Sequence, residues 1–145
     1  MPKPAPRQKP SLMPVLLVLA VLWYAQRGPV VVPDVVPSGG GKLVLLIHES
    51  EADTPETARA IVSLRNPPHA DTLKAGGHTL LILDPNAKNQ DNATAAVLAK
   101  YKTAFDGKPL PLLLTIDKSG KVVANPVGAT AGANEIMAAL KANGI

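Results

Sequence analysis

The chain has 145 residues, a length that suits one domain plus an appendage. Its net charge of +4 lies mostly in residues 1–41, with four bases against one acid (4 − 1 = +3), whereas residues 42–145 carry eleven bases and ten acids (11 − 10 = +1). This distribution and the presence of one Trp, two Tyr and one Phe argue against nucleic-acid binding, and the absence of cysteine excludes disulfides, thiolate zinc sites and cysteine nucleophiles.

The first predicted element is an apolar segment near the N-terminus. Residues 1–11 form a basic, Pro-rich tail that we expect to be disordered. Residues 12–27 begin with the uncharged run LMPVLLVLAVLWYA, a pattern typical of a membrane anchor or a secretory signal. The fourteen-residue run would span roughly 21 Å as a helix, less than the roughly 30 Å membrane core, which favours a cleaved signal. Trp23, two positions before Ala25, suits a signal peptidase poorly and favours a retained anchor; a buried core helix is a third alternative.

The charges that flank this segment predict its orientation. Three bases precede it and Arg27 follows it, so the positive-inside rule predicts a cytoplasmic N-terminus and an extracytoplasmic C-terminal domain, or a secreted domain after cleavage. Residues 28–41 have prolines at positions 29, 33 and 37 and end in SGGG, which predicts an extended, partly flexible linker. We therefore expect the folded domain to cover residues 42–145.

The domain is predicted to begin with a strand followed by a helix. Lys42–His48 is a short apolar run of the kind found in a strand buried on both faces. The sequence DTPE, at residues 53–56, then marks a helix start. Asp53 or Thr54 would cap the helix, Pro55 suits its first turn, and Glu56 would reach back to the free amides.

The rest of this helix is predicted from its apolar residues. Ala58, Ile61 and Val62 are expected to form its inward face, and the helix should end before Asn66 because two prolines follow. Arg65–His78 would then be an unusually long loop and a second contact surface.

Four further elements follow in order. Thr79–Leu83 predicts a second buried strand, Asn92–Phe105 a helix and Leu112–Ile116 a third strand. The turn Asp117–Gly120 joins the third strand to a fourth at Lys121–Ala124. A last helix is predicted over Ala133–Ala142, with Gly144 ending it. The side chains expected to face inward are Val97, Tyr101, Ala104 and Phe105 in the first of these helices and Ile136, Met137 and Leu140 in the second.

This order predicts the fold class. Two parallel strands with a right-handed crossover, followed by an antiparallel hairpin, make a four-stranded mixed α/β sheet with helices on both faces. The stretch Gly107–Ala129, GKPLPLLLTIDKSGKVVANPVGA, has a proline before the third strand, a DxxG hairpin and a Val-Gly pair before the last helix. In these features residues 42–145 resemble the thioredoxin-like superfamily.

The resemblance implies a site at the start of the first helix of the domain. The family's redox motif, Cys-Gly-Pro-Cys, corresponds to Asp53, Thr54, Pro55 and Glu56, so the proline matches and carboxylates replace both cysteines. The buried acid of redox-active members corresponds to Ile47. The resemblance also implies a cis bond between Leu110 and Pro111 facing this turn, where active relatives hold an extended peptide. The expected peptide-binding groove therefore consists of Asp53, Thr54, Pro55, Glu56, Leu110 and Pro111.

Without thiolates, the resemblance implies a redox-inactive domain. Our main hypothesis is a membrane-tethered, non-catalytic module that binds or assembles an unspecified protein partner. The alternatives are a structural accessory subunit of a larger membrane complex, or an enzyme that holds a metal with the carboxylates near His48, namely Glu49, Glu51 and Asp53. His69 and His78 are expected to be surface histidines. The sequence indicates no cofactor, small-molecule substrate or nucleic-acid partner.

Overall fold

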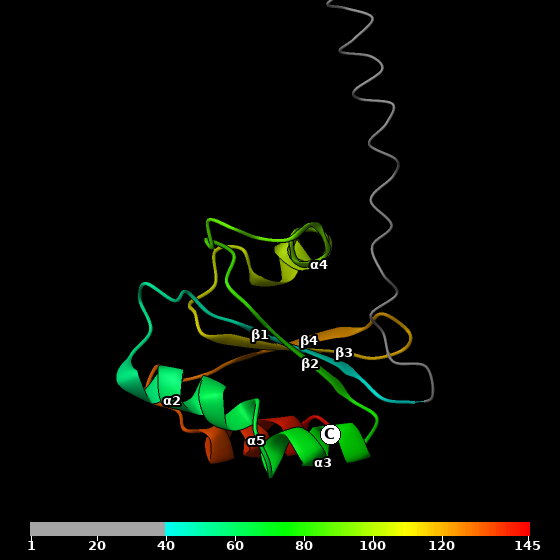
Figure 1. The fold of residues 1–145 in the computed structure, drawn as a ribbon. Coiled ribbons are helices and arrows are strands. Elements are labelled where there is room, and N and C mark those ends of the chain that lie inside the picture. Colours follow the sequence, from blue (N-terminus) through cyan, green and yellow to red (C-terminus); the bar gives the residue numbers. More distant parts are fainter. Residues whose placement is uncertain (1–39) are drawn as a thin grey trace, which may run out of the picture. The chain divides into compact units, whose positions relative to one another are not determined.

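The computed structural model describes residues 40–145, whose arrangement is shown in Figure 1. The expected tail, the anchor or signal segment, and the linker up to residue 39 lie outside the described residues. Within residues 40–145, none of the helices has the length and the apolar character that crossing a membrane requires.

The centre of the domain is a four-stranded mixed sheet. Its strands are β1 (Leu43–Ile47), β2 (Thr79–Leu83), β3 (Leu112–Ile116) and β4 (Val122–Pro126), arranged in the order β2-β1-β3-β4. β1 pairs in parallel with β2 and antiparallel with β3, and β3 pairs antiparallel with β4. The mixed sheet predicted from the sequence is therefore confirmed, and its topology is that of a thioredoxin-like fold.

The central strands are buried on both faces, as their unbroken apolar sequences predict. β1 consists of LVLLI, and each of its residues is buried. Because side chains alternate along a strand, Leu43, Leu45 and Ile47 join one hydrophobic cluster, whereas Val44 and Leu46 join a second on the opposite face. The two clusters form two core layers, one on each side of the sheet.

Helices cover both layers, as Figure 1 shows. α4 (Asn92–Phe105) packs on the first cluster. α2 (Pro55–Leu64), α3 (His69–Ala75) and α5 (Ala133–Ala142) contribute buried residues to the second. The bounds of α4 and α5 agree with the sequence prediction. Of the side chains of α4 and α5 that were expected to face inward, only Ala104 is not fully buried, and it still packs on the core. The buried ones are Val97, Tyr101, Phe105, Ile136, Met137 and Leu140.

The two edge strands differ from their predictions. β2 has the expected bounds, but only Leu83 is buried and the other residues are half-buried, because the strand has a neighbour on one side only. β4 covers Val122–Pro126 instead of Lys121–Ala124, because pairing with β3 continues to Pro126 opposite Leu112. The turn between β3 and β4 is as predicted: Gly120 has a φ of 81° and donates its N–H to the Asp117 carbonyl at 2.9 Å.

The inward face predicted for α2 was partly wrong. Ala58 is exposed and the Val62 side chain is 61% exposed, whereas Ile61 is buried as expected. The helix instead turns Thr57, Ala60, Ile61 and Leu64 toward the sheet. These positions recur at spacings of three and four residues, which places them on one helical stripe. α2 ends at Leu64, so the predicted stop before Asn66 is confirmed.

The segment expected to be a long loop contains α3. The N–H of Ala70 donates to the Asn66 carbonyl at 3.1 Å, and that of Thr72 donates to the Pro68 carbonyl at 3.1 Å. Leu73 is the one buried residue of this seven-residue helix. A single apolar anchor produces no helical periodicity, so the sequence pattern did not reveal α3.

Candidate functional site

The start of α2 and the segment before β3 enclose a cavity of about 240 Å³. Four of the six residues expected to form the groove line it: Asp53, Thr54, Leu110 and Pro111. The Leu110–Pro111 peptide bond is cis, as the resemblance implies. The structure therefore brings the helix start and the cis-proline together.

The other two expected residues lie outside this lining. Pro55 occupies the first turn of α2, where its missing N–H leaves no intrahelical bond unmade. Glu56 borders a different cavity, which Arg59 and Glu135 also line, and its side chain makes no hydrogen bond within residues 40–145. Glu56 therefore does not reach back to the free amides as expected.

Two threonine hydroxyls form the polar centre of the site. Thr54 is the N-cap of α2, and its Oγ1 accepts a hydrogen bond from the Thr57 N–H at 3.2 Å. Both hydroxyls donate to the Ala129 carbonyl, Thr54 at 2.5 Å and Thr57 at 2.8 Å. Their Oγ1 atoms are 3.2 Å apart. Thr54 and Thr57 thus have the i, i+3 spacing of the two cysteines in the family motif, and they tie the start of α2 to the loop before α5.

Asp53 is engaged by a histidine. Its Oδ2 lies 2.7 Å from Nδ1 of His48, and the two side chains are 12% and 11% exposed. Asp53 therefore lines the cavity with one carboxylate oxygen already bound to a neighbour. The sequence placed His48 and Asp53 in one acidic cluster but gave no sign of their direct contact.

The acidic residues of this cluster do not converge on one point. Glu49 accepts a hydrogen bond from the Asn86 side-chain amide at 2.9 Å, and Glu51 is exposed on the turn after β1. In the part of the chain that the structure describes, no group of three or more His, Asp or Glu side chains could hold a metal ion. The hypothesis of a carboxylate metal site therefore gains no support from the geometry.

A second carboxylate fixes the loop after β1 to the end of β2. Asp84 accepts hydrogen bonds from the Ser50 N–H at 3.1 Å, the Ser50 hydroxyl at 2.5 Å and the Asn86 N–H at 2.8 Å. Burial opposes ionisation of Asp84, but the hydrogen bonds from Ser50 and Asn86 outweigh burial and hold its pKa below the ordinary value. Asp84 is therefore a charged anchor for this loop.

Leu110 lines the cavity with a backbone that is free to pair with a ligand. Within residues 40–145 its N–H and C=O have no hydrogen-bond partner, whereas the neighbouring Pro111 carbonyl accepts from the Val127 N–H at 3.1 Å. The Leu110 side chain is half-buried and packs on the α4 core layer. Lys108 and Glu49 add one charge of each sign to the cavity lining.

The same region lacks the groups that thiol chemistry needs. The chain has no cysteine, and Ile47, at the position of the family's buried acid, is fully buried in the α4 core layer. Thiol–disulfide exchange requires a thiolate as nucleophile and leaving group. The site therefore cannot carry out that exchange with its own side chains.

No protein-family model and no curated protein matches the chain. Among solved structures, the chain is similar to a thioredoxin from Thermus thermophilus, with 11% identity over 72% of this chain and 75% of that chain and a TM-score of 0.47. It is also similar to a DsbH oxidoreductase, with 13% identity over 73% of this chain and 74% of that chain and a TM-score of 0.48. The strand order and pairing, observed in the chain itself, carry the thioredoxin-like description.

Proposed function

We propose that this protein is a redox-inactive thioredoxin-like domain that binds an extended polypeptide segment in the cavity beside Pro111. Residues 12–27 tether it to a membrane in this proposal. The observation that carries the binding role is the unpaired backbone of Leu110 in the cavity lining. An extended peptide can pair with such N–H and C=O groups whatever its sequence.

The threonine pair supports the proposal because it makes one wall of the cavity rigid. Thr54 and Thr57 bond to the Ala129 carbonyl, so two segments that line the cavity, the start of α2 and the loop before α5, are held together before any ligand arrives. A preorganised wall reduces the ordering entropy that binding costs. Because both hydroxyls already donate to a carbonyl, their role in this proposal is to hold the cavity wall and not to donate to the ligand.

The membrane tether rests on the sequence of residues 12–27 and its flanking charges. In this proposal the domain lies on the extracytoplasmic side, and its partner is a protein. Alkaline washing of membranes tests the tether, since a protein held only by charge is released and an anchored one stays. Recovery of the full chain in the soluble fraction would contradict the tether. It would not bear on peptide binding, which is tested separately.

Peptide binding can be tested by filling the cavity. Ala52 is exposed and lines the cavity, so Ala52→Trp should block it with little effect on the core. The matched control is Ala99→Trp on the exposed face of α4. Panning a displayed library of random 12-residue peptides on the full chain in a neutral detergent should enrich binders that Ala52→Trp weakens at least tenfold and Ala99→Trp leaves unchanged.

The location of binding can be measured separately. Enriched peptides should shift the NMR amide signals of Leu110 and Thr54. No enrichment, or equal binding to both tryptophan variants, contradicts the proposal.

A further inference from the structure

The outer edge of β2 presents unpaired backbone groups. The Thr79 N–H donates to the Lys42 carbonyl at 3.0 Å, and the His48 N–H donates to the Leu83 carbonyl at 3.0 Å, so the odd-numbered residues of β2 turn their backbone groups toward β1. Because these groups alternate in direction along a strand, Leu80 and Ile82 direct theirs away from the sheet. Among the described strands, none pairs with this edge.

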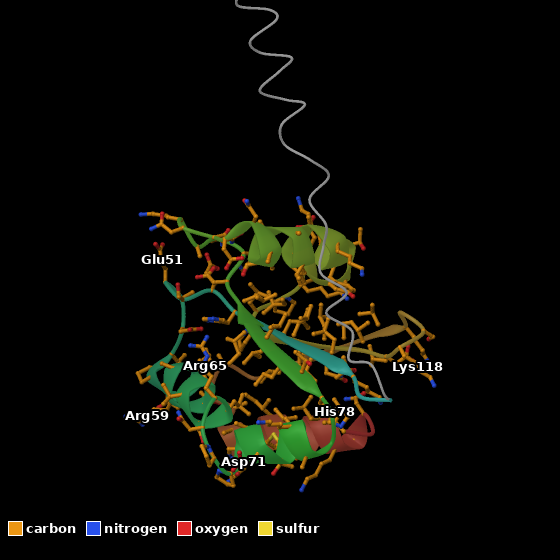
Figure 2. All side chains as sticks on the ribbon, turned by 45° about the vertical axis from the view of Figure 1, so that its right-hand side comes forward. Glu51, Arg59, Arg65, Asp71, His78 and Lys118 are labelled. Carbon is orange, nitrogen blue, oxygen red and sulfur yellow. The ribbon has the colours of Figure 1, made fainter. Side chains whose placement is uncertain are left out.

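A second cavity follows this edge. Its volume is about 420 Å³, and residues 80–83 of β2 form its floor. Leu73 and Lys74 of α3 border it on one side and Thr94 of α4 on the other. It shares no lining residue with the cavity at Pro111. Figure 2 shows β2 in front, with α4 above it and α3 below it.

The charges around this second cavity have one sign. The charged residues that line it are Arg65 and Lys74, and no carboxylate lines it; His78 also lines it, but its Nδ1 accepts a hydrogen bond from the Lys42 N–H. All three belong to α3 or to the segments joined to it, on the side of the sheet that α2 and α3 cover; Figure 2 labels Arg65 and His78 on that side of β2. The nearest acid along the strand, Asp84, is already bound by Ser50 and Asn86.

The edge also lacks the features that usually prevent strand addition. β2 has the sequence TLLIL, with neither a charged residue nor a proline. Proteins normally protect exposed edges with charges, prolines or a covering segment, because bare edges pair with other chains. The cationic rim here would repel a basic strand and attract an acidic one.

We propose that the β2 edge binds an extended acidic peptide of a partner protein as a fifth strand. Its backbone pairs with Leu80 and Ile82. Its carboxylates lie on the α3 side, near Arg65 and Lys74, and its apolar side chains lie on the α4 side, over Leu81. Strand periodicity gives this arrangement directly, since alternate side chains of an added strand point to opposite faces.

This surface is independent of the cavity at Pro111 and is tested with a different probe. The probe is the peptide acetyl-Glu-Val-Glu-Val-Glu-Val-Glu-amide, added to the full chain in a neutral detergent. It should shift and protect the amides of Leu80 and Ile82 in NMR hydrogen exchange. The same peptide with alternate nitrogens methylated, and one with lysine in place of glutamate, should each bind at least tenfold more weakly.

A pair of charge-matched variants tests the rim. Arg65→Gln combined with Lys74→Gln should weaken binding of the acidic peptide about tenfold, because two exposed ion pairs together contribute up to about that factor. Arg59→Gln combined with Lys118→Gln removes the same charge from exposed positions outside this cavity, labelled in Figure 2, and should weaken binding less than about twofold.

Three results would overturn the proposal. The first is equal weakening by the two double variants, which would assign the effect to net charge alone. The second is a set of shifts at Leu110 in place of β2, which would assign the peptide to the other cavity. The third is full protection of the Leu80 and Ile82 amides before peptide is added, which would show that another part of this chain already covers the edge.

Discussion

The central and the edge strands of the sheet differ in burial. β1 and β3 are buried at every position, whereas β2 is fully buried only at Leu83 and β4 has no fully buried residue. Each proposed binding surface uses backbone groups away from the central pair: the outer side of β2 and the segment before β3. We therefore expect the central strands to provide most of the stability, whereas both proposed binding surfaces lie at the margins of the sheet.

The largest expected effect tests the central pair. Leu113 of β3 is 0% exposed and packs in the cluster beneath α2 and α5, so Leu113→Ala should lower the free energy of unfolding by about 3 kcal/mol through lost burial and a cavity. Val123 of β4 is 37% exposed, and Val123→Ala should cost below about 1 kcal/mol. Urea unfolding followed by circular dichroism measures both, and equal costs would contradict the contrast between centre and edge.

A smaller effect is expected at the cavity beside Pro111, where Thr54 should contribute to the free energy of unfolding. Thr54→Ala removes the N-cap of α2 and one of the two bonds to the Ala129 carbonyl, so it should cost about 1 kcal/mol of unfolding free energy. Thr103→Ala is the control, because Thr103 is an exposed residue of α4 whose side chain makes no hydrogen bond within residues 40–145. If the two variants unfold at the same urea concentration, the threonine tie contributes nothing to stability.

The smallest effect concerns pH at the start of β2. Burial, with a contribution from the Lys42 charge, lowers the pKa of His78 below its ordinary value of about 6.5. The unfolded chain then binds the proton more readily, so this contribution to stability is lost as pH falls from about 6.5 toward the folded-state pKa. His78→Gln should therefore flatten the fall in unfolding free energy between pH 7 and pH 5.

An NMR titration of His78 provides the direct measurement. Its pKa should lie below 6.5 in the native chain and move upward in Lys42→Met, which removes the neighbouring positive charge. A native value at or above 6.5 would show that the edge of the sheet does not desolvate this histidine.

Much of the fold could be predicted because apolar runs and turn residues both mark its elements. Thr79–Leu83, Asn92–Phe105, Leu112–Ile116 and Ala133–Ala142 have the predicted bounds. α3 could not be predicted, because two prolines precede it and Leu73 is its one buried residue. The exposure of β2 depends on what neighbours it in the sheet, which local sequence does not encode.

The candidate site was predictable only in part. The resemblance gave the position of Pro111 and the start of α2, and the structure brings them together in one cavity. Thr57 lay one residue beyond the DTPE sequence and was missed, although its place three residues after the cap was a usable signal. Its other partner, the carbonyl of Ala129, is a backbone atom 72 residues away, and no sequence pattern identifies such a contact.

The uniform sequence of β1 has a consequence for how the sheet is aligned. A slip of one residue would exchange the two faces of LVLLI, yet every position would still hold an apolar side chain, so hydrophobicity alone penalises the slip weakly. The polar residues at the two ends of β1, Lys42 and His48, make specific hydrogen bonds that depend on the register. The Lys42 N–H donates to Nδ1 of His78 at 3.0 Å, and His48 bonds to the Leu83 carbonyl and to Asp53. A slip of one residue would separate the Lys42 N–H from His78, and His48 from Asp53 and the Leu83 carbonyl, so these contacts favour the observed register.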